Sequence, residues 1–426
     1  MKVALQVMEE NLASSTTSGR IPSSVLGPLR EPLFRSLWLA AVISYVGTWM
    51  QNVGAGWLMA SLTSSPFMVG LVQAAMALPV FLVVLPAGAL ADVVDRRKLL
   101  LITQLWMVAA ATALGIFTLS GHITPWLLLL FTFILGLGAV MNDPAWQAIT
   151  PDVVSRQNFA SAVALNSAGF NVARAIGPAL GGLVIATAGS GSAFLLNGLS
   201  FFGVIVFLYR WRRVDDSAAA SERIFQALAS GVRHLRESAA VKSVLVRTLM
   251  FSFAASAVLA LLPLIARPYG SVGFGILLGF FGLGALLGTA VLSWLRHRLP
   301  MDSTVALATV LFAATTILMG ITKPFPLLCL LLFAGGIGWI HIVASLNISA
   351  QTMSPIWLRA RAISMYLLVL QGGMAAGSAT WGALAWRWGI ARALLFSGCA
   401  LLLGLAAIPH FRLASRELPL SSAVQE

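Results

Sequence analysis

The chain has 426 residues, of which 59% are hydrophobic and only 10% are charged, and its net charge is +13. Soluble globular proteins carry about 25% charged residues, so this chain lacks the polar side chains that a water-facing surface requires. The composition excludes a soluble globular domain and indicates an integral membrane protein. The basic residues stand singly between apolar runs, which argues against nucleic acid as a partner.

Hydropathy predicts twelve membrane-spanning helices, because about 20 apolar residues cross the hydrocarbon core as a helix. Residues 1–33 precede them as a polar cytosolic tail without the apolar core of a signal peptide. The predicted spans are 37–61, 66–91, 98–120, 125–148, 159–187, 191–211, 243–266, 271–295, 303–323, 325–350, 361–385 and 389–411.

The longest internal connection, residues 212–242, divides the predicted spans into two groups of six, within residues 34–211 and 243–411. Its sequence places Ile224, Leu228 and Val232 on one helical face. We expect an amphipathic helix lying against the bundle or the lipid surface; a partner-binding segment is the alternative. Residues 412–426 form a C-terminal tail.

The distribution of basic residues predicts the orientation in the membrane. Of the 27 Lys and Arg residues, 22 fall in the two tails, in the connections after even-numbered spans or in the span ends that adjoin them. Because cytoplasmic loops carry the excess of Lys and Arg, both termini are expected in the cytoplasm.

The two halves also match each other at a constant offset of 200 residues, which indicates a duplicated six-helix unit. Parallel repeats of this kind are one plan of secondary transporters, with the substrate site between the repeats. The matching pairs are Gly88 and Gly288, Arg96 and Arg296, Gly138 and Gly338, Asn171 and Gln371, Gly177 and Gly377, and Gly182 and Gly382.

The stretch GALADVVDRRKLL, residues 88–100, occupies the predicted cytosolic turn after the second span. A carboxylate there can meet the positive N-terminus of a helix, and bases can meet helix C-termini. Ordinary decoration of a cytosolic loop with bases is the alternative. The residues in register are Gly88, Asp92, Arg96, Arg97 and Lys98, whereas Val93 and Asp95 depart from the pattern discussed below.

The stretch ARAIGPALGG, residues 173–182, lies inside the fifth span. Ala173, Gly177 and Gly181 recur every four residues and form a small-residue ridge that another helix can approach closely. Pro178 removes a backbone donor and favours a bend, and Gly182 follows it. Plain helix packing explains this motif equally well.

These motifs resemble those of the major facilitator superfamily. The first resembles its cytosolic signature loop, and the second its antiporter motif, with Ala173 in place of the first glycine. The segments 142–154, 166–182 and 357–373 resemble the bacterial branch of drug and siderophore exporters related to the enterobactin exporter. The resemblance implies an all-α fold of two pseudo-symmetric six-helix bundles, a latch on the cytoplasmic gate formed by the loop, and exchange of substrate for protons.

Ionisable residues within membrane segments are functional candidates by default. Asp143 lies in the fourth predicted span, Arg174 in the fifth and His341 in the tenth. In the superfamily, spans one, four, seven and ten line the cavity, so Asp143 and His341 are expected to face each other across it. For Asp143 the alternative is a structural pair with Arg156 or with the loop bases at the cytosolic end, and for His341 a hydrogen-bonded imidazole in the core.

Arg174 has two possible roles on sequence grounds. It is either a gate or substrate contact, or a buried arginine bonded to carbonyls and asparagine side chains. The polar residues that could line the substrate cavity or join helices are Gln51, Asn52, Asn142, Asn166, Asn171, Asn347 and Gln371.

Together these features predict a monomeric exporter of a small amphipathic compound in a bacterial inner membrane, driven by proton antiport. No phosphate-binding G-x-x-x-x-G-K-[ST] loop and no zinc-binding spacing occurs, so we expect neither an enzyme nor a cofactor or metal site. Two alternatives remain open: an uncoupled facilitator or importer, and a non-transporting membrane scaffold or sensor.

Overall fold

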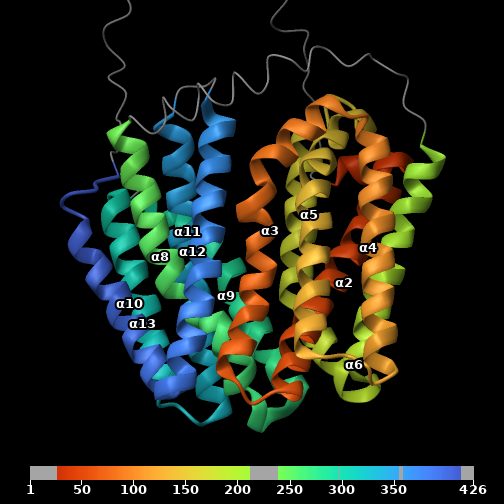
Figure 1. The fold of residues 1–426 in the computed structure, drawn as a ribbon. Coiled ribbons are helices and arrows are strands. Elements are labelled where there is room, and N and C mark those ends of the chain that lie inside the picture. Colours follow the sequence, from red (N-terminus) through yellow and green to blue (C-terminus); the bar gives the residue numbers. More distant parts are fainter. Residues whose placement is uncertain (1–25, 212–237, 297, 355–357, 414–426) are drawn as a thin grey trace, which may run out of the picture.

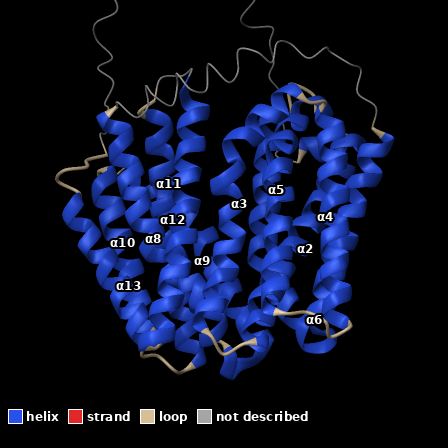
Figure 2. Cartoon of the chain, in the orientation of Figure 1, coloured by secondary structure: helices blue, strands red, loops and turns tan. Residues whose placement is uncertain are grey.

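A computed structural model of the chain describes residues 26–211, 238–296, 298–354 and 358–413. Within these ranges the regular elements are helices joined by short connections (Figure 2). The predicted amphipathic helix of the 212–242 connection falls almost wholly outside the described residues, as do most of the N-terminal tail and all but two residues of the C-terminal tail.

The long helices form two groups, coloured from red to green and from green to blue in Figure 1. The N-bundle contains α2 (Pro32–Leu62), α3 (Pro66–Val93), α4 (Arg96–Leu119), α5 (Pro125–Val153) and α6 (Phe159–Arg210). The C-bundle contains α8 (Ala239–Ile265), α9 (Gly270–Arg296), α10 (Met301–Met319), α11 (Phe325–Thr352), α12 (Arg359–Trp388) and α13 (Ile390–Gly404). The described residues also include three short 3-10 helices: η1 (Gly27–Arg30), η2 (Arg267–Tyr269) and η4 (Leu405–Ala407).

The 52-residue helix α6 contains two of the twelve predicted spans. Its backbone leaves helical geometry at Gly189, where φ is +79° and ψ is 166°. On either side of this corner, Gly181 packs on Met50 of α2, and Asn197 donates a hydrogen bond to Gln51 of the same helix. One α2 segment can contact both only if α6 doubles back, so the eleven membrane-length helices of the described chain supply twelve spans.

The ends of the bundle differ in how the chain connects them. We call the end where residues 211 and 238 lie the linker end, and the opposite end, with the connections 63–65, 120–124 and 320–324, the distal end (Figure 1). Local chemistry starts several helices there: the Ser65 and Thr124 hydroxyls accept hydrogen bonds from the N–H groups of Met68 and Leu127. Such caps satisfy donors that the first helical turn leaves unpaired.

The predicted repeat at an offset of 200 residues is confirmed by the helix boundaries. Helix α5 begins at residue 125 and α11 at residue 325, and α6 and α12 begin at 159 and 359. The corner at Gly189 is matched by Gly389, with a φ of +89°. The fold is therefore two pseudo-symmetric six-helix bundles, as predicted.

Two seams join the bundles: α3 packs on α12, and α6 packs on α9. Glycines allow the backbones to touch, since a Cβ on Gly275 would lie 2.4 Å from the carbonyl oxygen of Pro178. A Cβ on Gly70, in the other seam, would lie 2.6 Å from the carbonyl oxygen of Ser378. Helices in lipid associate through close packing of this kind, because the hydrophobic effect does not drive them together there.

Hydrogen bonds reinforce contact between the bundles at the distal end. The Arg267 guanidinium donates to the carbonyl oxygens of Ala60 and Thr63, at the end of α2. The Ser271 hydroxyl donates to the carbonyl of Gly182 over 3.1 Å. These contacts join the two bundles at the distal end, so the structure is closed there.

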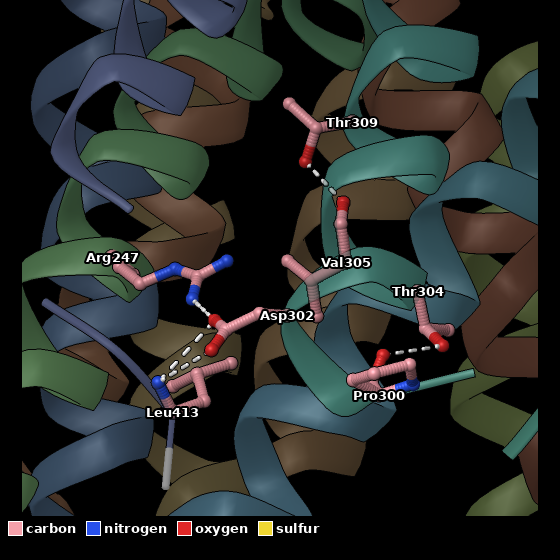
Figure 3. A network of polar contacts seen from close by, with 7 residues as sticks. All are labelled: Arg247, Pro300, Asp302, Thr304, Val305, Thr309 and Leu413. Carbon is pink, nitrogen blue, oxygen red and sulfur yellow. Dashed lines mark hydrogen bonds and ion pairs between the residues drawn. The ribbon is translucent and has the colours of Figure 1, made fainter. Parts of the chain in front are cut away.

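The C-bundle is fastened at its linker end by one acidic residue (Figure 3). Asp302, in the first turn of α10, pairs with Arg247 of α8 and accepts hydrogen bonds from the Leu413 N–H at 3.2 and 3.3 Å. Arg247 is buried, and the Asp302 carboxylate compensates its charge. The contact joins α8, α10 and the segment after α13.

Candidate functional site

A pocket of about 1180 Å³, including its open mouth, lies in the N-bundle on the linker half of the membrane. We call it the vestibule. It lies between one residue of α2 and the facing sides of α5 and α6. Its lining consists of Tyr45, Trp146, Gln147, Thr150, Phe159, Val163, Asn166, Ser167, Phe170 and Asn171.

Aromatic rings form one wall of the vestibule. Tyr45 meets Phe170 edge to face, with ring centroids 5.4 Å apart and an interplanar angle of 85°, and Trp49 lies 6.2 Å from Phe170. Gly177 leaves room for Trp49, because a Cβ there would be 2.6 Å from the tryptophan Cβ. Rings in this arrangement suit an apolar or aromatic part of a ligand.

Asp143 lies one turn deeper in the membrane than the α5 residues that line the vestibule. It precedes Trp146, Gln147 and Thr150 by three, four and seven residues, which places it on the same face of α5. Its side chain is exposed, and no hydrogen bond or ion pair to another described residue is found. The ion pair with Arg156 that the sequence offered as an alternative is absent. Tyr45 lies near enough to Asp143 to interact with it electrostatically.

Arg174 lies one turn beyond the α6 residues that line the vestibule. It follows Phe170 and Asn171 by four and three residues and so shares their face of the helix. Its Nε and Nη2 atoms are buried and have no hydrogen-bond partner among the described residues. Asn171, a partner expected from the sequence, donates instead to the Ser167 carbonyl of its own helix over 2.9 Å.

His341 does not join this group. The imidazole is buried, and its Nδ1 lies 2.8 Å from the carbonyl oxygen of Ile337, one turn earlier in the same helix. No contact links His341 to Asp143, although the sequence placed them face to face. The structure thus gives His341 the geometry of the alternative reading, a hydrogen-bonded imidazole in the core.

Two amides expected in the cavity instead join helices inside the N-bundle. Gln51 is buried and accepts a hydrogen bond of 2.6 Å from Asn197. Asn142 is buried and accepts hydrogen bonds from Thr103 and Gln104 of α4 at 3.2 and 3.1 Å. Polar side chains used in this way hold helices together rather than contact a substrate.

The remaining amides are placed differently. Asn166 lines the vestibule and donates to the Thr150 hydroxyl over 3.4 Å. In the C-bundle, Asn347 accepts a hydrogen bond from Gln351 of its own helix. Asn52 and Gln371 are partly exposed and have no hydrogen-bond partner among the described residues.

The gate motif holds the N-bundle together at the linker end. Arg97 donates to the carbonyl oxygens of Leu208 and Tyr209 at the C-terminus of α6, over 2.7 and 3.0 Å. Arg96 donates to the Ala148 carbonyl over 3.4 Å. Cations at a helix C-terminus are stabilised by its partial negative charge.

Three further residues complete the picture of this motif. The side chain of Asp92 and the surroundings of Gly88 lie outside the described residues. Lys98 is exposed, and its backbone N–H is bound by the Asp95 carboxylate over 2.8 Å. Asp95 departs from the family pattern, and the structure shows why an acid stands there: it is the N-cap of α4 and binds the N–H three residues later.

The antiporter motif has two packing faces. Ala173 is buried, and Gly177 and Gly181 pack on α2, where a Cβ on Gly181 would lie 2.9 Å from the Met50 Cα. Pro178 and Gly182 face α9 across the seam between the bundles. The motif thus brings α6 against its own bundle and against the other one.

A profile described as "Transmembrane secretion effector" matches residues 23–424. The chain belongs to this family, MFS_3, within the major facilitator superfamily. It is a multi-pass membrane protein and a member of a family of transporters of small molecules.

Characterised relatives include siderophore transporters. The enterobactin exporter EntS of Escherichia coli is 28% identical over 400 residues, which cover 90% of this chain and 94% of EntS. The staphyloferrin A transporter of Staphylococcus aureus is 22% identical over 281 residues, covering 64% of this chain and 70% of that protein.

Solved structures share the fold at low identity. A bacterial homologue of the human lysosomal transporter Spinster, in an inward-facing and unoccupied conformation, matches with a TM-score of 0.70 and 14% identity, over 91% of this chain and 96% of that one. The nucleoside transporter NupG matches with a TM-score of 0.67 and 12% identity, over 89% and 99%.

Proposed function

We propose that this major facilitator protein exports a small amphipathic compound, a drug or a siderophore-like metabolite, in exchange for protons. The family and its siderophore-transporting relatives support export of such a compound. The vestibule, with aromatic walls and a few polar groups, has the character of a small-molecule site.

The observation that carries proton coupling is the state of Asp143. It is an ionisable group at membrane depth, on the α5 face that lines the vestibule one turn away, and without a cationic partner among the described residues. A carboxylate in a wet cavity releases its proton, and one enclosed in a dry cavity retains it. Opening and closing of the bundles around Asp143 therefore couples its protonation to the transport cycle.

The closed distal seams and the vestibule on the linker half correspond to one of two alternating states. The distribution of Lys and Arg assigns the linker end, with both termini, to the cytoplasm. With the linker end in the cytoplasm, the closed distal end supports an assignment to the inward-facing state. Transport then requires the distal seams to part while the linker end closes, and Arg96 and Arg97 are candidate parts of that gate.

The proposal includes a monomer working in the bacterial inner membrane, with protons, the bilayer and the exported compound as its partners. It requires no enzymatic step, cofactor, metal or nucleic acid. Arg174 contributes charge within the cavity. The antiporter motif of Ala173, Gly177, Pro178, Gly181 and Gly182 supplies the packing surface on which the bundles rock.

Transport by purified protein in proteoliposomes tests this function, with a panel of fluorescent cationic dyes and aromatic carboxylates and an imposed pH gradient. We expect flux that stops when the gradient collapses and that is lost in Asp143→Asn. The matched control is Asp152→Asn, which changes an acid nine residues later and so on the opposite side of α5.

Other outcomes identify the alternatives. Flux that persists unchanged without the gradient, or in Asp143→Asn, contradicts proton coupling and supports a facilitator or an importer. The absence of flux for every compound, in protein that remains folded, supports a scaffold or sensor.

A further inference from the structure

The unpartnered atoms of Arg174 form one edge of its guanidinium group. Nε and Nη2 point their hydrogens in parallel along the same side of the planar fork, and both atoms are buried without a partner among the described residues. This edge is the part of arginine that matches a carboxylate, with two parallel N–H···O bonds. A buried polar group without partners is costly and calls for a ligand or a functional explanation.

The position of Arg174 can be compared with its counterpart in the other bundle. The 200-residue repeat pairs Arg174 with Met374, which is buried in an apolar cluster with Ala77 of α3 and Trp339. Arg174 crosses α9 at Gly282, where a Cβ would lie 2.8 Å from its carbonyl oxygen. The same position in the fold therefore accepts a neutral, apolar side chain, so packing of the seam does not require an arginine.

The surroundings of Arg174 leave its charge unanswered. In α2 the vestibule is lined by Tyr45, Trp49 packs behind it on Phe170, and α9 contributes Gly279 and Gly282 at the crossing. Asp143 is the acid on the facing side of α5, and no ion pair joins it to Arg174. The vestibule follows α6 from Phe159 to Asn171, and Arg174 stands one turn beyond its lining on the same face of the helix.

We propose that Arg174 binds a carboxylate group of the transported compound through its Nε–Nη2 edge. The proposal rests on the proposed export function and specifies its substrate class: an amphipathic carboxylate whose apolar or aromatic part lies against Tyr45, Trp49 and Phe170. A carboxylate supplies two coplanar oxygens and one negative charge, which satisfy both orphan donors and the buried cation together.

Binding to the full-length protein in lipid nanodiscs tests the proposal without relying on transport. The probes are 2-naphthoate and its neutral analogue 2-naphthamide, followed by quenching of tryptophan fluorescence. Hydrogen bonds to a charged group are worth enough to give at least about a tenfold preference for the carboxylate. We expect this preference in the wild type, a reduced one in Arg174→Lys, which keeps the charge without the fork, and none in Arg174→Met.

Thermal unfolding supplies a second readout and shows that the variants fold. Because Met374 occupies the equivalent position, Arg174→Met should unfold at the same or a higher temperature than the ligand-free wild type. Naphthoate should raise the unfolding temperature of the wild type but not that of Arg174→Met.

Several results would overturn the inference. Equal binding of naphthoate and naphthamide by the wild type, or an undiminished preference in Arg174→Met, excludes a carboxylate on this edge. A large drop in the unfolding temperature of Arg174→Met identifies a structural arginine instead. Loss of naphthoate binding in Asp143→Asn but not in Arg174→Met assigns the ligand to another group.

The failure of this inference is distinguishable from failure of the export function. Proton-driven flux in proteoliposomes that is insensitive to Arg174→Met leaves export standing and refutes the carboxylate contact. Preferential naphthoate binding without flux supports the contact and contradicts export.

Discussion

Gly182 of α6 and Gly275 of α9 meet so closely at the distal end that a Cβ on Gly182 would lie 3.2 Å from the Gly275 Cα. The other seam repeats the contact, since a Cβ on Gly70 would lie 3.2 Å from the Gly382 Cα. Two equivalent glycine crossings therefore hold the bundles together. Any side chain added at these points must separate the helices.

The variant Gly275→Ala should open the seam between α6 and α9. Its Cβ would lie 2.4 Å from the Pro178 carbonyl oxygen, and backbone cannot move aside as a flexible side chain does. Overpacking of this kind costs about 1–3 kcal/mol, so the unfolding temperature in detergent should fall. Gly279→Ala is the control in the same helix, because its nearest contact is 3.3 Å away. Equal unfolding temperatures for the two variants would disprove the tight crossing.

The hydrogen bonds of Arg267 should determine how long the distal end stays closed. Replacing Arg267 by Gln removes donors to Ala60 and Thr63 of the other bundle. A cysteine at Ser271, which is buried in the seam, can report opening through labelling by a membrane-impermeant maleimide. We expect several-fold faster labelling in Arg267→Gln, in a background where Cys329 and Cys399 are replaced by serine.

The control for this labelling experiment is Arg387→Gln, which removes an exposed arginine at the same end of the molecule. Comparable labelling rates in both variants would show that Arg267 does not hold the seam.

The variant Asp302→Asn should destabilise the C-bundle. It leaves the buried Arg247 guanidinium without a carboxylate, and removal of one partner from a buried pair costs about 3–5 kcal/mol. The lower part of that range applies because a quarter of the Asp302 side chain is exposed. The double variant Arg247→Met with Asp302→Asn should recover much of the loss in thermal unfolding. A double variant no more stable than Asp302→Asn would exclude a stranded charge as the cause.

Glu31, before the first residue of α2, should make stability depend on pH. The hydrogen bond from the Asn158 side chain, followed by bonds from Ser155, lowers the pKa of Glu31 below its ordinary value of 4.5. A carboxylate whose pKa is lower in the folded state than in the unfolded state stabilises the fold at pH values above its unfolded pKa. This stabilisation is lost as the pH falls through the folded-state pKa. The unfolding temperature of the wild type should therefore exceed that of Glu31→Gln at pH 7, and the difference should shrink as the pH falls through the lowered pKa of Glu31. A difference that stays constant down to pH 3 would refute this.

Much of the fold was readable from the sequence because the bilayer imposes simple rules. The need for about 20 apolar residues per span fixed α5 and α11 to within a few residues of their observed ends. The repeat was also readable, from pairs such as Gly88 and Gly288, and the matching corners at Gly189 and Gly389 agree with it. The sequence did not predict that α6 turns at Gly189 without a loop, because hydropathy shows where apolar residues stand but does not report backbone dihedral angles.

The direction of polar side chains was the least predictable feature. Gln51 and Asn52 are neighbours in sequence, yet successive helical residues point about 100° apart. The structure turns Gln51 onto Asn197, and Asn142 onto Gln104, so amides expected in a cavity are used in packing. Asp143 and Arg174 were recognisable because a charge within a membrane segment stands out regardless of which way it faces.

The corner at Gly189 also constrains how the protein is made. Two spans follow each other within 52 residues, and only the short Gly/Ser stretch at 189–192 marks where the first crossing ends. A Cβ at Gly189 would meet nothing within 4 Å, so space is available in the finished fold, but φ of +79° with ψ of 166° is accessible almost only to glycine. A substitution there is therefore expected to act during insertion, when the nascent hairpin must turn back into the bilayer, and to reduce the yield of protein more than the stability of the molecules that complete it.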